Sequence, residues 1–253
     1  MDFNIAVLGG DGIGPEVTAE GVKVLKAVGR VFGHRFDLEH GEVGGISIDQ
    51  HGAPLLPRVR DLAGAADAVL FGAVGGPKWD DPAAPVHPED GLLQLRAHLG
   101  VFANIRPVKV YPWLADCSVL KPAALEGVDL VVVRELTGGL YYAKPRGRHQ
   151  TPQGWTAVDT MRYSEAEIER VLRVGFELAR SRRGKLVSVD KANVLECSKL
   201  WRQTATRLAA EYPDVELSHL LVDSCAMQLV QRPARFDVIV AENTFGDILT
   251  DEA

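Results

Sequence analysis

The segment KLVSVDKANVLECSKLWRQTATRLAAEYPDVELSHLLV, residues 185–222, decides the fold because it passes from strand to helix and back to strand. Apolar and β-branched residues at 185–189 and at 215–222 are typical of buried strands, and residues 195–211 between them are typical of a helix. A helix at 224–230 and a strand at 237–240 continue the alternation. Strands that alternate with helices predict an α/β fold.

The same alternation extends toward the N-terminus. Residues 128–134, VDLVVVR, predict a strand that is covered on both faces. Other strands and helices are expected at 4–8, 16–28, 68–71, 91–99 and 102–110. In the helix at 16–28 we expect a buried face made of Val17, Val22, Val24, Leu25 and Val28. We place a domain boundary near Val101, which gives a first domain at 1–101 and a second at 102–253.

The segment 140–163 departs from this pattern because it is rich in Tyr, Gly, Pro, Thr and Trp. Such a composition predicts an extended hairpin or arm. Ser164 and Glu167 follow it with the spacing of a capping box, which predicts a long helix from there to about Arg183.

Composition excludes several classes of protein. The 253 residues carry a net charge of −6, which disfavours nucleic acid and anionic membranes as partners. No apolar run is long enough to span a bilayer, and the N-terminus does not resemble a signal peptide. The three cysteines match no zinc or redox spacing, so we expect reduced thiols in a cytoplasmic protein.

A glycine-rich loop, LGGDGIGPE at 8–16, joins the first strand to the first helix. Backbone amides in such a loop can approach an anion at a helix N-terminus. The loop does not contain the Gly-x-Gly-x-x-Gly dinucleotide fingerprint, so a classical Rossmann fold is not expected. A tight turn without a ligand is the alternative interpretation.

Three arginines, Arg96, Arg106 and Arg134, stand beside apolar residues at the ends of predicted elements. Arginine binds a carboxylate through paired hydrogen bonds, so the three could hold a dicarboxylic substrate. Leu92 and Leu93 share a helix face with Arg96 and would add an apolar patch. Surface arginines and a core-facing leucine stripe are the alternative interpretation.

Other candidate residues carry acid, base or metal chemistry. Lys191 follows a buried strand, where desolvation would make it a usable base, although it could simply reach water. Tyr141 could act as an acid or as a packing residue. Asp223 also follows a strand, and Asp247 and Asp251 share a helix face; such oxygen ligands suit Mg²⁺ or Mn²⁺. An aspartate that begins a helix can equally be a response to the helix dipole.

The order of the motifs is more specific than any one of them. GDGIGPE at 10–16, GLLQLR at 91–96, RELTGGLY at 134–141, VDKANVL at 189–195 and FGDILTD at 245–251 occur here in succession. The chain resembles the isocitrate/isopropylmalate dehydrogenase family over essentially its whole length. That resemblance implies a two-domain α/β fold with a large mixed sheet, an NAD cofactor, Mg²⁺ or Mn²⁺, and oxidation of a dicarboxylic hydroxyacid followed by decarboxylation.

The resemblance also implies residue roles. Arg96, Arg106 and Arg134 match the positions that bind the malate carboxylates. Lys191 matches the base on the 2-hydroxyl and Tyr141 the acid that protonates the enolate carbon. The implied metal ligands are Asp223, Asp247 and Asp251, and the implied cofactor contacts are Glu89, Gly76 and Pro77. A homodimer is expected, formed through the second domain and the arm, in which Lys191 and Asp223 enter the partner's site.

The resemblance places Leu92, Leu93 and Val194 against the variable group of the substrate. Apolar residues there favour the isopropyl group of 3-isopropylmalate over the third carboxylate of isocitrate, and hence a role in leucine biosynthesis. Relatives continue beyond residue 253, so we expect the first domain to be completed, and the adenosine to be held, by sequence outside this chain, which alone would be inactive. The alternatives are a non-catalytic fragment that keeps the dimerising half, or a tartrate, malate or homoisocitrate dehydrogenase.

Overall fold

The computed structural model describes residues 1–118 and 120–253, which form two compact units, Met1–Gly100 and Val101–Ala253. The sequence analysis put the division one residue later, between 101 and 102. Each unit has its own sheet and its own buried core. The α/β class and the mixed sheet that the sequence predicted are confirmed, because one strand of the larger sheet runs antiparallel to its neighbour.

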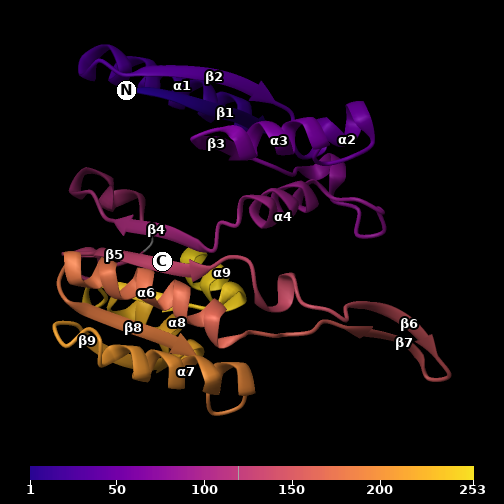
Figure 1. The fold of residues 1–253 in the computed structure, drawn as a ribbon. Helices are drawn as coiled ribbons and strands as arrows, with labels where there is room; N and C mark the ends of the chain where they lie inside the picture. The colour runs from indigo at the N-terminus through magenta and orange to yellow at the C-terminus, as the bar shows by residue number, and fades with distance from the viewer. Residues whose placement is uncertain (119) are drawn as a thin grey trace. The chain divides into compact units, whose positions relative to one another are not determined.

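Unit 1 is built on a three-stranded parallel sheet with the order β2–β1–β3 (Figure 1). A buried apolar cluster that includes Leu8, Val59 and Leu95 forms its core. Its elements are β1 (Asp2–Gly10), α1 (Gly14–Phe32), β2 (Arg35–Gly41), α2 (Gly45–His51), α3 (Pro57–Ala65), β3 (Ala68–Ala73), the 3-10 helix η1 (Pro77–Trp79) and α4 (Pro88–Leu99).

The buried face of α1 differs from the one expected. Val17 and Val24 are 51% and 62% exposed, whereas Thr18 and Gly29 are buried. A Cβ at Gly29 would lie 2.7 Å from the His34 carbonyl oxygen, so α1 approaches the neighbouring backbone through small residues. The prediction is wrong for Val17 and Val24, because it followed side-chain hydrophobicity alone, whereas Val22, Leu25 and Val28 are half-buried.

Unit 2 is built on a five-stranded sheet with the order β4–β5–β10–β8–β9, in which only β4 is antiparallel to its neighbour. Its strands are β4 (Ala103–Lys109), β5 (Asp129–Glu135), β8 (Lys185–Asp190), β9 (Glu216–Leu221) and β10 (Val238–Ala241), and β6 (Gly147–Thr151) with β7 (Gly154–Val158) forms a separate hairpin. Its helices are η2 (Pro112–Cys117), α5 (Pro122–Leu125), η3 (Gly139–Tyr141), α6 (Glu165–Ser181), α7 (Glu196–Ala209), α8 (Val222–Gln231), η4 (Pro233–Arg235) and α9 (Asn243–Glu252).

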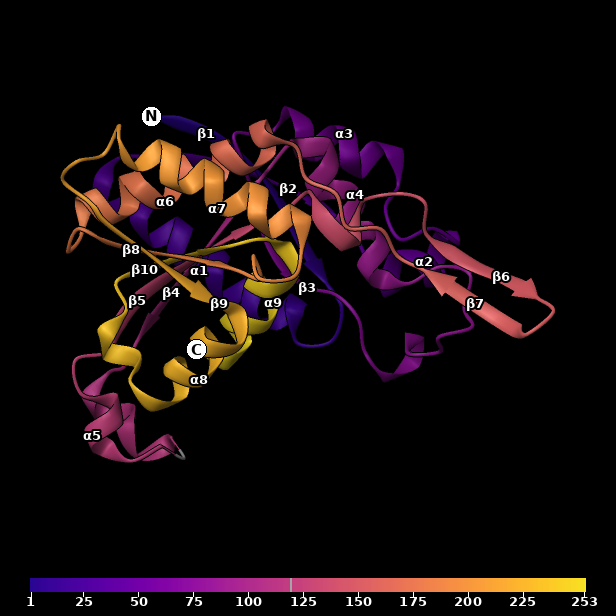
Figure 2. The ribbon, with the colours of Figure 1, turned by 90° about the horizontal axis from the view of Figure 1, so that it is seen from below.

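Helices cover both faces of this sheet (Figure 2). Val131 and Val133 of β5 pack with α6 and α7, and Leu130 and Val132 pack on the side of α8 and α9. The alternation follows from the two-residue period of a strand. The prediction that 128–134 is covered on both faces is therefore confirmed, and this double cover fixes the strand that ends with Arg134 and Glu135.

The segment 140–163 contains the β6–β7 hairpin, and the side chains of that hairpin are almost all exposed, including Trp155 at 73%. The capping box is confirmed: Ser164 Oγ accepts from the Glu167 N–H at 3.3 Å, and the Ser164 N–H donates to Glu167 Oε2 at 2.8 Å. That box starts α6 where the arm returns to the sheet.

The cysteines are free thiols: Cys117 is exposed, Cys197 is half-buried and Cys225 is buried. Burial raises the pKa of the Cys225 thiol to about 12, so this side chain behaves as an apolar core residue. Within residues 1–118 and 120–253, no helix has the length and apolar character needed to cross a membrane.

Candidate active site

Four strands of unit 2 end at one edge of the sheet, because β5, β10, β8 and β9 run parallel to one another. Arg134 ends β5 together with Glu135, Asn243 follows β10, Lys191 follows β8, and Asp223 follows β9. The carboxyl edge of such a sheet is where α/β proteins bind ligands. Most of the predicted residues of this unit therefore lie near one edge of the sheet, in two groups.

The first group is built around the buried guanidinium of Arg134, which is 3% exposed. Its Nε and Nη2 donate to Asn243 Oδ1 at 3.0 and 2.8 Å, and its Nη1 forms an ion pair with Asp247. The Tyr141 hydroxyl donates to the other oxygen of Asp247 at 2.8 Å. Burial and this hydrogen bond raise the pKa of Tyr141 to about 12. The phenol therefore stays protonated at neutral pH.

Gly246 explains how α9 comes so close to Arg134. A Cβ at residue 246 would lie 2.7 Å from Arg134 Cγ and 2.8 Å from its Cβ. A larger residue would push the helix that carries Asp247 away from β5. The glycine of the motif FGDILTD is thus required for the contact between Arg134 and Asp247.

The second group is the ion pair between Lys191 and Asp223, whose Nζ and Oδ1 lie 2.5 Å apart. The lysine holds the pKa of the Asp223 carboxyl below its usual range. Asp190 fixes the turn that carries Lys191. Its carboxylate is buried, accepts from the Ala192 N–H at 2.9 Å, and accepts twice from the Arg202 guanidinium at 2.8 Å.

The three predicted metal ligands do not form one cluster. Among residues 1–118 and 120–253, no group of three or more His, Cys, Asp or Glu side chains could hold a metal ion. Asp247 and Asp251 are four residues apart on α9 and share one face, whereas Asp223 is paired with Lys191. Two carboxylates are a common protein contribution to a Mg²⁺ site, so α9 fits a hard divalent cation that takes its other ligands from outside this pair.

Arg106 lies on β4 on the same face of the sheet as Arg134. Asn104 is directly opposite Arg134 in the antiparallel register, and Arg106 is two residues further along β4. Arg106 is exposed, and its Nε donates to Asn104 Oδ1 at 2.8 Å. Val194 lies in the turn after β8 and is 63% exposed.

In unit 1, the core-facing residues of α4 are not the predicted binding leucines. Leu95 is buried in the core with Gly91, whereas Leu92 and Leu93 are half-buried. Arg96 is half-buried as well. Leu95 therefore makes the core contact of α4, and the binding role of Leu92 and Leu93 stays a prediction.

The predicted cofactor residues Gly76, Pro77 and Glu89 line one pocket of about 440 Å³ in unit 1, together with Trp79 and His87. Gly75 packs closely against Glu89 at this pocket, since a Cβ at residue 75 would lie 2.7 Å from Glu89 Oε1. The three residues are thus brought to one hollow within a single unit.

Asp11 of the glycine-rich loop holds the rim of this pocket. Its buried carboxylate accepts from the N–H groups of Gly45 and Ile46, both at 2.7 Å, and of Gly75 at 2.9 Å. A Cβ at Gly14 would lie 2.1 Å from the Gly9 carbonyl oxygen, so that glycine serves close packing. The geometry therefore supports the tight-turn interpretation of the loop.

Sequence reasoning did not find Asn243, Asp190 or Asp11. Asp190 and Asn243 are polar residues at or just after the ends of buried strands, the same signal that identified Lys191 and Asp223. Asp11 had no such signal, because its donors lie 34 to 64 residues away in the chain.

The fold and these groups define an α/β protein whose candidate site suits an anionic ligand and a divalent cation. The chain belongs to the isocitrate/isopropylmalate dehydrogenase family, whose model matches residues 4–253.

Individual relatives agree with this assignment. The chain is 58% identical to the 3-isopropylmalate dehydrogenase of Dehalococcoides mccartyi, a match that covers 100% of this chain and 70% of that protein. It is 58% identical to the 3-isopropylmalate dehydrogenase of Anaeromyxobacter dehalogenans, covering 100% and 72%.

Solved structures share the fold. The isocitrate dehydrogenase of Methylococcus capsulatus matches with a TM-score of 0.81 and 32% identity, covering 99% of this chain and 69% of that one. The TT0538 protein of Thermus thermophilus matches with a TM-score of 0.81 and 33% identity, covering 98% of this chain and 47% of that one.

Proposed function

We propose that the protein oxidises and decarboxylates 3-isopropylmalate with NAD⁺, giving 4-methyl-2-oxopentanoate for leucine biosynthesis. The chain spans about 70% of the length of the relatives it matches, and the proposed activity is that of the whole protein. The observation that carries the proposal is the group of Arg134, Tyr141 and Asp247, in which a buried cation, a phenol and a carboxylate meet at the carboxyl edge of the sheet.

Each step has a candidate residue in this chain. Arg134, with Arg106 and Arg96, binds the substrate carboxylates. Lys191 takes the proton of the 2-hydroxyl, and NAD⁺, when bound, would supply the acceptor for the hydride of C2. The resulting β-keto acid loses CO₂, and Tyr141 donates the proton that the enolate carbon then requires.

Asp247 and Asp251 are the proposed ligands of Mg²⁺ or Mn²⁺, joined by Asp223 of the partner subunit. When bound, the cation would supply Lewis-acid polarisation of the hydroxyl and carbonyl oxygen. Asp247 is partly exposed, and each of its oxygens keeps a lone pair beyond its bonds to Arg134 and Tyr141.

Substrate choice is proposed to depend on Leu92, Leu93 and Val194. Leu92 and Leu93 are half-buried on α4, next to the buried Leu95, and Val194 is exposed in the turn after β8. The relatives named 3-isopropylmalate dehydrogenase support this choice over isocitrate.

We also propose a homodimer with shared sites. The β6–β7 hairpin exposes Trp155 and Val158, and α8 and α9 expose Met227, Val230 and Ile248. A hairpin with so little buried surface has no core of its own and gains stability by packing on another chain.

Removal of the divalent cation is the test of the proposed reaction. In Mg²⁺ or Mn²⁺ the whole protein should form NADH and CO₂ in equal amounts from 3-isopropylmalate, because each turnover oxidises and decarboxylates one molecule. A chelator should abolish both products, and added Mg²⁺ should restore them. NADH formation that persists in excess chelator, or NADH without CO₂, would contradict the proposal.

A further inference from the structure

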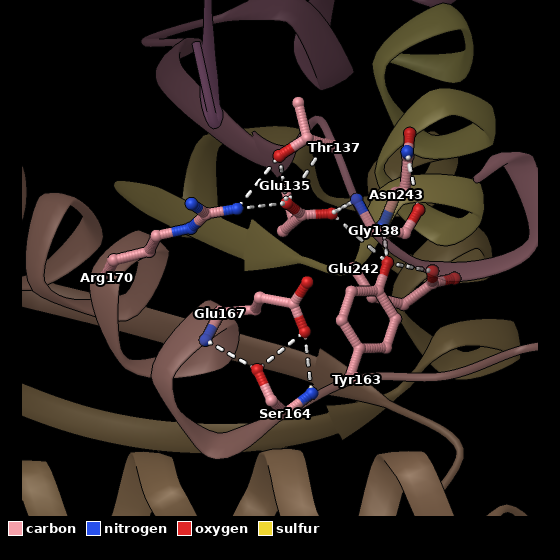
Figure 3. Close-up of polar contacts among 9 residues, drawn as sticks. All are labelled: Glu135, Thr137, Gly138, Tyr163, Ser164, Glu167, Arg170, Glu242 and Asn243. Atoms are coloured by element: carbon pink, nitrogen blue, oxygen red, sulfur yellow. Dashed lines mark hydrogen bonds and ion pairs between the residues drawn. The ribbon is translucent and has the colours of Figure 1, made fainter. Parts of the chain in front are cut away.

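Two buried glutamates lie on either side of one phenol at the carboxyl edge of the sheet (Figure 3). Glu135, Glu242 and Tyr163 are 0%, 3% and 7% exposed. The Tyr163 hydroxyl oxygen is 3.3 Å from Glu135 Oε2 and 3.1 Å from Glu242 Oε2. Two carboxylate charges at this depth would be costly unless each is compensated.

Glu135 has the partners of an ionised carboxylate. Its Oε1 accepts from the Thr137 N–H at 2.9 Å and lies 3.6 Å from Arg170 Nη2. Its Oε2 accepts from the Gly138 N–H at 2.8 Å. Backbone donors and one guanidinium thus compensate its charge.

Glu242 has fewer compensating groups. It accepts from the N–H groups of Thr244 at 3.0 Å and Phe245 at 2.7 Å, as the N-cap of α9. Among the described residues, it makes no ion pair with a Lys, Arg or His. Burial, with the negative Glu135 nearby, raises the pKa of the Glu242 carboxyl.

The phenol has one proton for two carboxylates. Tyr163 also accepts from the Asn243 N–H at 3.0 Å. If Glu242 is neutral, it donates to the Tyr163 oxygen and Tyr163 donates to Glu135, so that every group has a partner. If both glutamates are ionised, the single Tyr163 hydroxyl can donate to only one of them, and the other carboxylate receives no hydrogen bond from the phenol.

This cluster adjoins the residue that holds Arg134. Asn243 follows Glu242 directly, its N–H is bound by Tyr163, and its Nδ2 donates to the Gly138 carbonyl oxygen at 3.0 Å. Its Oδ1 is then left facing the Arg134 guanidinium. The orientation of Arg134 depends on Asn243, and that of Asn243 depends on the cluster.

We propose that Glu135, Tyr163 and Glu242 are positioning residues, in which the phenol keeps its own proton and the two carboxylates share one more at neutral pH, and that they thereby fix Asn243 and the Arg134 guanidinium. The role in substrate binding rests on the proposed function of Arg134. The sharing of the proton does not, so the two parts can fail separately.

Exchanging each glutamate for glutamine tests the shared proton. Glu242→Gln keeps an oxygen for the Phe245 N–H and an NH₂ donor for Tyr163 and loses only the acceptor of the Thr244 N–H, so its melting temperature should fall by no more than about 4 °C. Glu135→Gln removes the charge beside Arg170 and sets an NH₂ group against backbone N–H donors. Its melting temperature should therefore fall much further than that of Glu242→Gln. Equal losses in the two variants would overturn the proposal.

Infrared spectroscopy gives a direct reading of the same proton. At pH 7 the wild-type protein should show the carbonyl stretch of a buried protonated carboxyl group, and Glu242→Gln should lack it. A wild-type spectrum without this band would contradict proton sharing, whatever the activity of the protein.

Removal of the phenol oxygen tests the effect on Arg134. Tyr163→Phe keeps the ring, which packs edge-on against Trp201, but leaves the Asn243 N–H without its acceptor. Its Kd for 3-isopropylmalate should rise about tenfold. Tyr212→Phe is the matched control, because Tyr212 is a buried tyrosine of the same unit that stacks on Phe176, and its Kd should not change.

A folded Tyr163→Phe protein with the Kd of wild type would overturn the positioning role. If the wild-type protein itself fails to bind 3-isopropylmalate, the proposed function is wrong. The infrared band and the glutamine pair would then still decide whether the cluster shares a proton.

Discussion

Lys191→Ala should lower the rate of NADH formation from 3-isopropylmalate about 10³-fold, because it removes the proposed base for the hydroxyl proton. The fold should survive the change, since Asp223, the partner of Lys191, is 61% exposed and can be hydrated. Lys199→Ala is the control: Lys199 lies on α7, is partly exposed and pairs with Glu196. Stopped-flow absorbance of NADH measures the effect.

The same experiment separates Lys191 from Tyr141. Tyr141→Phe removes the proposed acid and not the proposed base, so NADH should still form in the first turnover while release of 4-methyl-2-oxopentanoate becomes slow. A Lys191→Ala protein with wild-type oxidation would exclude the lysine as the base. Full activity of Tyr141→Phe would leave Tyr141 as a packing residue beside Asp247.

Mixing two inactive variants should restore activity if sites are shared between chains. Within one chain, Lys191 pairs with Asp223 while Asp247 belongs to the Arg134 group, and the described residues form no three-ligand metal cluster. Lys191→Ala and Asp247→Asn should each be inactive alone. In their heterodimer one site would combine the intact Lys191 of one chain with the intact Asp247 of the other.

Heterodimers purified through two different affinity tags allow this measurement. We expect NADH formation to recover to about half the rate of the wild-type dimer, because one of the two sites is intact. Purified heterodimers with no more activity than either parent would contradict shared sites and leave each chain to form a site by itself.

Much of the fold could be predicted because its signals are local. The strand at β5, the strand–helix–strand pattern from β8 to β9 and the Ser164 capping box each depend on residues that are neighbours in the chain. The motifs that carry the family resemblance are also short stretches of neighbouring residues. Of the residues that the resemblance implies, the structure brings Gly76, Pro77 and Glu89 to one pocket.

The rest depends on contacts between distant residues. Arg134 and Asn243 are 109 positions apart, and Tyr163 and Glu242 are 79 positions apart. No spacing rule links such pairs. Part of the α1 face was also mispredicted, because Thr18 and Gly29 are buried while Val17 and Val24 are exposed.

The ratio of kcat/KM for 3-isopropylmalate to that for isocitrate, measured on the whole protein with NAD⁺ and Mg²⁺, tests the proposed function most directly. In the proposed site, burial of an isopropyl group against apolar side chains would contribute about 2 kcal/mol, which corresponds to about 30-fold. Isocitrate would set a third carboxylate against the same apolar side chains and lose further affinity. We predict a ratio of at least about 30; equal or inverted values would contradict the assignment.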